Sequence, residues 1–153
     1  MKKGIVGLMV GILCASIAGA VERPGTLIAT MKTASMVSQD QLAKAVEAYI
    51  AEIQKEKGAF VLNDDKTDLP LTLTQDKILR EEATLLEANR YCVPGVFKGI
   101  DGKSYEIDFV LKPGLISKEI KVADAYIHKV DGVERYQWTQ EKNEWKRESA
   151  TKM

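Results

Sequence analysis

Two Asp-Gly dipeptides in the last third of the chain, Asp101-Gly102 and Asp131-Gly132, place the strongest constraint on the fold. Asp-Gly is favoured in two-residue β-hairpin turns because both positions tolerate a positive φ. Pro113-Gly114 stands between the two dipeptides as a further turn, and Lys142-Asn143 is expected to reverse a final pair of strands. The spacing of these turns predicts a long antiparallel meander over the last third of the chain.

One amphipathic helix precedes these strands. Ser38, followed three residues later by Gln41, forms a capping box that is typical of a helix N-terminus, and Gly58 is placed to end the helix. The apolar residues between these ends share one stripe: Leu42, Val46, Tyr49, Ile50 and Ile53. We therefore predict a helix over about residues 38–57 with one face packed on another element.

The segment after the helix predicts a β-hairpin, with strands at residues 60–62 and 69–74 and a polar turn between them. The acidic run at residues 63–68 has Asp68 and Thr74 where a calcium loop needs Gly and Glu, so it is interpreted as a solvated hairpin tip. Residues 76–88 fit a short helix, which we favour, although residues 83–86 could instead lead directly into a strand.

These elements define an α+β class, with one main helix packed across an antiparallel β-meander. The order of elements over residues 38–149 resembles that of cystatin-like and nuclear-transport-factor-like domains. The resemblance implies a cystatin-like roll, and it implies no particular site because it rests on element order alone. At 153 residues the chain has room for one such domain.

The N-terminus has the pattern of an export signal. Lys2 and Lys3 precede an apolar stretch over residues 4–17, and Ala18-Gly19-Ala20 supplies the small residues that a signal peptidase needs. We expect residues 1–20 to be a cleaved signal peptide and residues 21–37 an extended arm. The mature protein would be periplasmic or extracellular and would have no membrane span.

Charge and motif content exclude several classes of function. Lys and Arg total 22 and Asp and Glu total 22, so the overall charge predicts no nucleic-acid partner, and only a local patch could attract an anionic membrane. Cys92 is the one cysteine left after cleavage, which rules out an internal disulfide. With one histidine and no phosphate-binding loop or haem motif, we expect no cofactor and no metal.

The first Asp-Gly turn assigns faces to two candidate sites. A two-residue turn at Asp101-Gly102 pairs Cys92 with Leu111 on the apolar face that meets the helix. Cys92 is then a buried apolar residue, with a redox, dimer-forming or metal-binding thiol as the alternative. Glu106 and Asp108 point to the other face, which we expect to be the solvent side, with general acid–base work as the alternative.

His128 is the only histidine, and it is expected to be a half-buried strand residue near a turn. A tight turn at Pro113-Gly114 would place His128 and Cys92 toward opposite ends of the sheet, more than ~20 Å apart at ~3.3 Å per residue. The sequence therefore predicts no Cys–His dyad.

The final hairpin carries the candidate binding residues. A two-residue turn at Lys142-Asn143 places four side chains on one face: Tyr136, Trp138, Trp145 and Arg147. The neighbouring strand is expected to continue this face through Ala123, Ala125 and Ile127. This face is either part of a second small core, closed by the arm or by residues 76–88, or an exposed aromatic platform that binds a ligand.

Three functions remain open. The preferred one is a non-enzymatic exported binding module for a protein or a small apolar ligand, present as a monomer or weak homodimer. The second is a pocket-bearing enzyme with Asp108 or Glu106 as general base and Tyr105 or His128 as hydrogen-bond donor, although the register puts Tyr105 and Asp108 on opposite faces. The third is a structural dimer linked through Cys92 or through the arm at residues 21–37.

Overall fold

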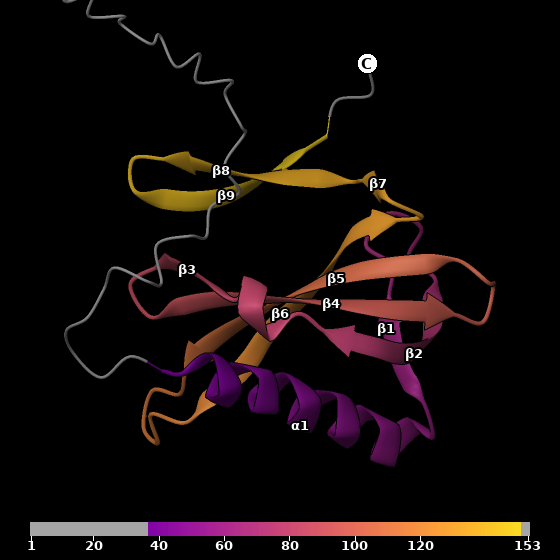
Figure 1. Cartoon of the computed structure of the whole chain (residues 1–153), viewed down its shortest axis with the longest axis horizontal. Helices are drawn as coiled ribbons and strands as arrows, with labels where there is room; N and C mark the ends of the chain where they lie inside the picture. Colours follow the sequence, from indigo (N-terminus) through magenta and orange to yellow (C-terminus); the bar gives the residue numbers. More distant parts are fainter. Residues whose placement is uncertain (1–36, 151–153) are drawn as a thin grey trace, which may run out of the picture.

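The computed structural model describes residues 37–150, and three layers can be followed in Figure 1. Helix α1 (Gln39–Lys57) packs on one face of a seven-stranded antiparallel sheet, and a two-stranded hairpin lies over the other face. The predicted signal peptide and the arm, apart from Val37, lie outside the described residues. None of the described helices is both long and apolar enough to cross a membrane. The packing of one helix on an antiparallel sheet confirms the α+β class.

The large sheet runs in the order β1-β2-β4-β5-β6-β7, with β3 pairing on β4, and β8 and β9 form a separate sheet. The strands are β1 (Phe60–Asn63), β2 (Pro70–Ile78), β3 (Thr84–Glu87), β4 (Arg90–Gly99), β5 (Ser104–Pro113), β6 (Ile120–Val130), β7 (Val133–Glu134), β8 (Tyr136–Glu141) and β9 (Glu144–Ser149). The sheet curls so far that Asp64, just after β1, pairs with Arg135, just after β7.

The helix forms where the sequence predicted it. The Ser38 side-chain oxygen accepts a bond from the Gln41 N–H at 3.2 Å, and Gln41 Oε1 accepts one from the Ser38 N–H at 2.9 Å. Gly58 ends the helix at φ 77°, a left-handed conformation that glycine adopts without strain. Both predicted caps are therefore confirmed.

The main core lies between α1 and the sheet. Its fully buried large residues come from the helix stripe and from β1, β4, β5 and β6: Leu42, Val46, Phe60, Val93, Phe97, Ile107, Phe109, Leu111 and Ile127. The rings of Phe60, Phe97 and Phe109 lie 5.2 to 6.3 Å apart between centroids. Such aromatic contacts favour one arrangement of helix on sheet over alternatives, because the rings prefer particular offsets and tilts.

The predicted hairpin after the helix is confirmed as β1 and β2, which pair antiparallel. The favoured short helix over residues 76–88 is wrong. Strand β2 continues to Ile78, a three-residue 3-10 helix spans Arg80–Glu82, and β3 follows. Thr84 and Leu85 pair with β4, so their main-chain groups bond to a neighbouring strand instead of within a helix.

The first Asp-Gly turn is one residue longer than predicted. The Gly99 N–H donates to the Lys103 carbonyl, which leaves a loop of residues 100–102 with Gly102 at φ 82°. Tyr91, not Cys92, therefore pairs with Leu111. Because side chains alternate along a strand, this one-residue shift moves Cys92 to the face away from the helix. The predicted face of Cys92 is wrong, whereas its burial is confirmed at 4% exposure.

The turns at Asp131-Gly132 and Lys142-Asn143 are confirmed, but the meander stops early. Asp131-Gly132 joins β6 to β7 with Val130 opposite Val133, and both turn residues have positive φ. Lys142-Asn143 likewise joins β8 to β9 through a two-residue turn. However, β7 has only two residues, and the chain then leaves the sheet, so that the β8–β9 hairpin covers the outer face instead of extending the edge. At Pro113-Gly114, a loop over residues 114–119 replaces the expected tight turn.

Candidate functional site

The aromatic face of the C-terminal hairpin is turned inward. The register places Tyr136, Trp138, Trp145 and Arg147 on one face, as predicted. Tyr136 is buried, and Trp138 and Trp145 pack against a second core cluster on the outer face of the sheet. That cluster consists of Leu86, Cys92 and Val110, with Tyr126 beside it. The face therefore closes a second small core, and binding by these residues stays a prediction.

Two cationic side chains fasten the hairpin over this core. Arg90 Nη2 donates a hydrogen bond of 2.7 Å to the main-chain carbonyl of Trp145. The Arg147 guanidinium lies 3.4 Å above the centroid of the Tyr126 ring, a cation–π arrangement.

The expectation that the neighbouring strand continues the aromatic face through Ala123, Ala125 and Ile127 is wrong. Ala125 and Ile127 pack on the helix side, and Ala123 is exposed.

Two β-bulges in β6 account for this change of face, one at Ala123, which has no partner between Val122 and Asp124, and one at His128. Glu106 pairs with Lys129 while Ile107 pairs with Ile127, so His128 is an extra residue in the ladder. A bulge re-aims the side chains around it. Here His128 and Lys129 both face Glu106, with His128 Nδ1 3.4 Å and Lys129 Nζ 3.1 Å from Glu106 Oε1.

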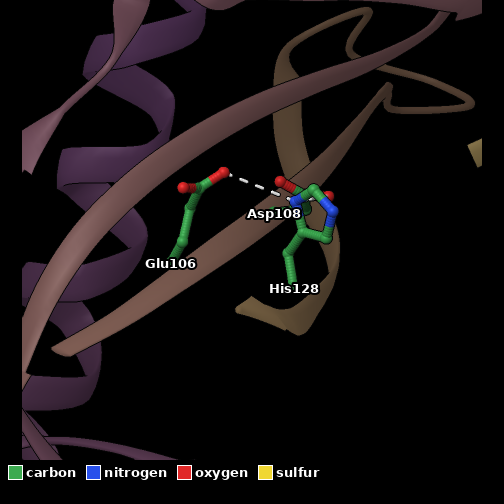
Figure 2. Close-up of side chains that lie close together, drawn as sticks. All are labelled: Glu106, Asp108 and His128. Atoms are coloured by element: carbon green, nitrogen blue, oxygen red, sulfur yellow. Dashed lines mark ion pairs between the residues drawn. The ribbon is translucent and has the colours of Figure 1, made fainter. Parts of the chain in front are cut away.

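Under the hairpin, Glu106, Asp108 and His128 converge (Figure 2). Asp108 is 3% exposed, and its Oδ2 accepts hydrogen bonds from the Tyr136 hydroxyl at 2.7 Å and the Trp138 indole N–H at 2.9 Å. His128 Nδ1 lies 3.5 Å from the same oxygen, and the His128 ring stacks on the Tyr136 ring at 4.9 Å. The expectation that both carboxylates lie on the solvent side is wrong for Asp108, which the hairpin covers, whereas Glu106 is half-buried beside His128 and Lys129.

The charges in this cluster balance. Hydrogen bonding to His128, with help from Lys129, lowers the pKa of Glu106 to about 2. Burial disfavours the charged form of His128, but its hydrogen bond to Glu106 and the negative charge of Asp108 outweigh this, and the pKa of His128 is raised. With His128 protonated, two carboxylates face two cations, so the charges are compensated by neighbouring side chains.

The same side chains carry donor atoms suited to a metal ion. One atom each from Glu106, Asp108 and His128 lies within 4.8 Å of the other two. A tetrahedral ion with bonds of ~2.0–2.1 Å to nitrogen and oxygen has ligands ~3.3–3.4 Å apart. The distances of 3.4 and 3.5 Å from His128 Nδ1 to the two carboxylate oxygens are close to that spacing.

The thiol and the histidine do not form a site together. Cys92 is level with Val110 on β5, which in turn is level with Asp124 on β6, four residues from His128. At ~3.3 Å per residue this is ~13 Å along the strand. Burial, followed by the charge of Asp108, raises the pKa of the Cys92 thiol well above its ordinary value, so the reactive thiolate is disfavoured.

The acidic hairpin tip is not uniformly solvated, contrary to the prediction. Asp64 is 4% exposed, accepts a bond of 2.9 Å from Arg135 Nη2, and accepts another of 2.9 Å from the Lys66 N–H. The hydrogen bond to Arg135 lowers the pKa of Asp64 to about 2, against the opposing effect of burial. Asp64 therefore anchors this tip to the start of the C-terminal hairpin.

The sequence indicated the carboxylates and the aromatic residues of this cluster as two separate candidate sites, and it did not predict that they lie together. It named Glu106 and Asp108 as a carboxylate pair and Tyr136 and Trp138 as a binding face, and in the structure Tyr136 and Trp138 both donate to Asp108 Oδ2. Placing His128 beside them required the bulge at that residue, for which the sequence contains no recognisable signal. Tyr105 and Asp108 lie on opposite faces, as expected, because Tyr105 belongs to the helix-side core and donates to Asp101.

No family model, curated protein or solved structure matches this chain.

Proposed function

We propose that this chain is an exported, non-enzymatic binding domain, and that Glu106, Asp108 and His128 bind a divalent transition-metal ion beneath the C-terminal hairpin. The observation that carries the proposal is the spacing of the three donor atoms, all within 4.8 Å of one another. Export to the periplasm or cell exterior is supported by the two lysines and the apolar stretch at the N-terminus.

The donor set favours a transition metal over calcium or magnesium. One imidazole nitrogen and two carboxylate oxygens are ligands that zinc and manganese accept, whereas calcium and magnesium prefer all-oxygen sites. Glu106 and His128 keep part of their surface exposed, with side-chain exposures of 19% and 14%, so an ion could enter without the whole hairpin leaving.

Metal binding here competes with a proton, with a lysine and with the two hydrogen bonds that Asp108 Oδ2 already accepts. Because His128 Nδ1 must present a lone pair to the ion, the proton that neutralises the cluster has to leave. Lys129 Nζ, which lies 3.1 and 3.2 Å from the two oxygens of Glu106, must also move aside. Affinity is therefore expected to rise between pH 6 and pH 8.

The enzyme alternative receives less support from the same geometry. A general base works best when its pKa lies near the working pH. Glu106, with a pKa of about 2, is a weak base at neutral pH because His128 and Lys129 already stabilise its charge. Tyr105 is on the far face of the sheet and cannot assist.

The dimer alternative and the fold relationship remain separate proposals. Cys92 is buried under the hairpin, so a disulfide between two copies would require the hairpin to open. A dimer through the arm at residues 21–37 stays a prediction. For the fold, we propose a cystatin-like roll, which is supported by one long helix packed on one face of an antiparallel sheet.

The test is isothermal titration of the full chain with Zn²⁺ and Mn²⁺ at pH 6 and pH 8. We expect one ion per chain, tighter binding at pH 8, and binding about tenfold weaker or worse in His128→Gln and Glu106→Gln. Asp76→Asn, which removes an exposed carboxylate on β2, is the matched control and should bind as the unaltered chain does.

Circular dichroism of each variant confirms that it is folded before titration. If neither ion binds at pH 8, or if His128→Gln binds as tightly as Asp76→Asn, the metal proposal is wrong. The cluster would then act only to hold the hairpin against the sheet.

A further inference from the structure

The loop between β5 and β6 presents two adjacent apolar side chains entirely to solvent. Leu115 is 104% and Ile116 is 97% exposed relative to an extended reference, more than any other exposed large apolar residue among those described. The others, Leu69, Ile100 and Val133, are 61%, 82% and 68% exposed and do not adjoin one another in sequence. These two neighbouring branched side chains leave their apolar surface in water, which is unfavourable, and no packing contact offsets that cost.

The backbone of this loop is closed, so the exposure is part of its shape. The Gly114 N–H donates to the Glu119 carbonyl at 2.8 Å, and the Glu119 N–H donates to the Ser117 hydroxyl at 3.3 Å. Lys118 adopts a positive φ of 53° within this closed loop. The bonds at the base of the loop leave residues 115 and 116 at its tip.

Three basic side chains lie in this loop or at its base. Lys112 and Lys121 stand directly opposite each other where β5 and β6 meet the loop, and Lys118 lies in the loop itself. Like charges directly opposite on neighbouring strands are unfavourable for a sheet. Glu119, 3.5 Å from Lys121, offsets one of the three positive charges and leaves a net positive charge at the base of the loop.

We propose that this loop docks on an anionic lipid bilayer surface, with Leu115 and Ile116 inserted among the acyl chains and the three lysines against the lipid phosphates. An apolar tip that projects from a basic loop base matches the layering of such a surface, where apolar tails lie beneath negatively charged head groups. The inference goes beyond the proposed metal site, which lies under the hairpin and involves none of these residues. The chain's overall charge of zero does not oppose it, because the attraction is local.

Methyl NMR provides a test with a control inside the same molecule. The full chain, labelled at isoleucine and leucine methyl groups, is mixed with vesicles that contain phosphatidylglycerol and a small fraction of lipid with a gadolinium head group. The Leu115 and Ile116 methyl signals should broaden strongly. The Ile100 signal should change far less, because Ile100 lies in the β4–β5 turn at the other end of β5 (Figure 1).

Vesicle sedimentation of matched variants gives the second measurement. We expect binding at least tenfold weaker for Leu115→Ser/Ile116→Ser, and an unchanged affinity for Ile100→Ser, which also removes an exposed apolar side chain. Replacement of Lys112 and Lys118 by Gln should weaken binding and reduce its salt dependence. Every variant keeps the same N-terminal residues, so those residues cannot cause a difference between variants.

Broadening of Ile100 as strong as that of Leu115, or equal sedimentation of Leu115→Ser/Ile116→Ser and Ile100→Ser, overturns the proposal. The absence of broadening at residues 115 and 116 also overturns it and would leave a protein as the partner of this loop. Equal binding to phosphatidylcholine vesicles would contradict the part assigned to the lysines.

Discussion

Replacement of Asp64 by Asn tests whether one ion pair holds the curled sheet and the C-terminal hairpin together. The Asp64 carboxylate is buried and bonds to Arg135, and it also accepts the Lys66 N–H. An asparagine can keep the bond from Lys66 but loses the negative charge. Arg135 would be left with Asp65, whose Oδ1 is 3.8 Å from Nη1, as its remaining acidic neighbour.

The expected loss can be worked from the pKa of Asp64. The pKa falls from 3.8 to about 2 in the folded protein. Each pKa unit corresponds to ~1.4 kcal/mol of differential stabilisation, so the charged carboxylate contributes about 2 kcal/mol. Breaking one partner of a buried pair commonly costs ~3–5 kcal/mol, and we therefore expect Asp64→Asn to lose about 2–3 kcal/mol of unfolding free energy at pH 7.

The sign of the pH dependence follows from the lowered pKa. A carboxyl whose folded-state pKa is depressed stabilises the protein above its unfolded pKa, and this stabilisation is lost as the pH falls through the folded pKa. For Asp64 that window runs from about pH 4 down to about pH 2. The difference between the unaltered chain and Asp64→Asn should shrink across this window.

Urea denaturation at pH 7, pH 4 and pH 2.5 measures this difference directly. Asp68→Asn is the matched control, because Asp68 is exposed in the same loop and asparagine tolerates its positive φ of 56°. A loss below ~0.5 kcal/mol at pH 7, which is the range of ordinary surface substitutions, would refute the reasoning. A large loss that stays constant between pH 4 and pH 2.5 would also refute it.

Three further predictions concern the hairpin, the thiol and the first Asp-Gly turn. Trp138→Phe removes the donor to Asp108 Oδ2 and should lower the unfolding free energy by about 1 kcal/mol in urea denaturation, whereas an unchanged midpoint would contradict the hydrogen bond. Cys92 should react with a thiol reagent far more slowly in the native than in the denatured protein, because burial raises its pKa, and equal rates would show that the hairpin does not cover it. Gly102→Ala should cost about 1 kcal/mol in thermal unfolding, because alanine is strained at φ 82°, and an unchanged melting temperature would contradict the loop conformation.

Local signals in the sequence predicted the elements that local chemistry determines. The helix begins and ends at its predicted caps because Ser38 and Gln41 satisfy each other's main-chain groups and Gly58 adopts the left-handed conformation. The Lys142-Asn143 turn is also confirmed, with both residues at positive φ. In each case residues within a few positions of one another decide the outcome.

The errors arose where distant strands decide the outcome. An Asp-Gly dipeptide fits both a two-residue and a three-residue hairpin loop, and the choice moved Cys92 to the other face of β4. The bulge at His128 depends on how β6 pairs with β5, and no local pattern marks it. The sequence predicted Glu106 and Asp108 as a carboxylate pair. It did not predict that the β8–β9 hairpin covers Asp108, which happens because β7 has only two residues and the chain then leaves the large sheet.

Because β8 and β9 pair separately from the large sheet, we expect the hairpin to open more easily than the large sheet. Within the described residues these strands form their ladder only with each other, and mainly side chains such as Arg90, Tyr136 and Trp138 attach them to the large sheet. The hairpin could therefore lift as a sub-global opening event while the main-chain ladder of β4 and β5 stays intact. Amide protons of β8 and β9 would then exchange by this lower-energy route, and Asp108 would meet solvent without unfolding of the domain.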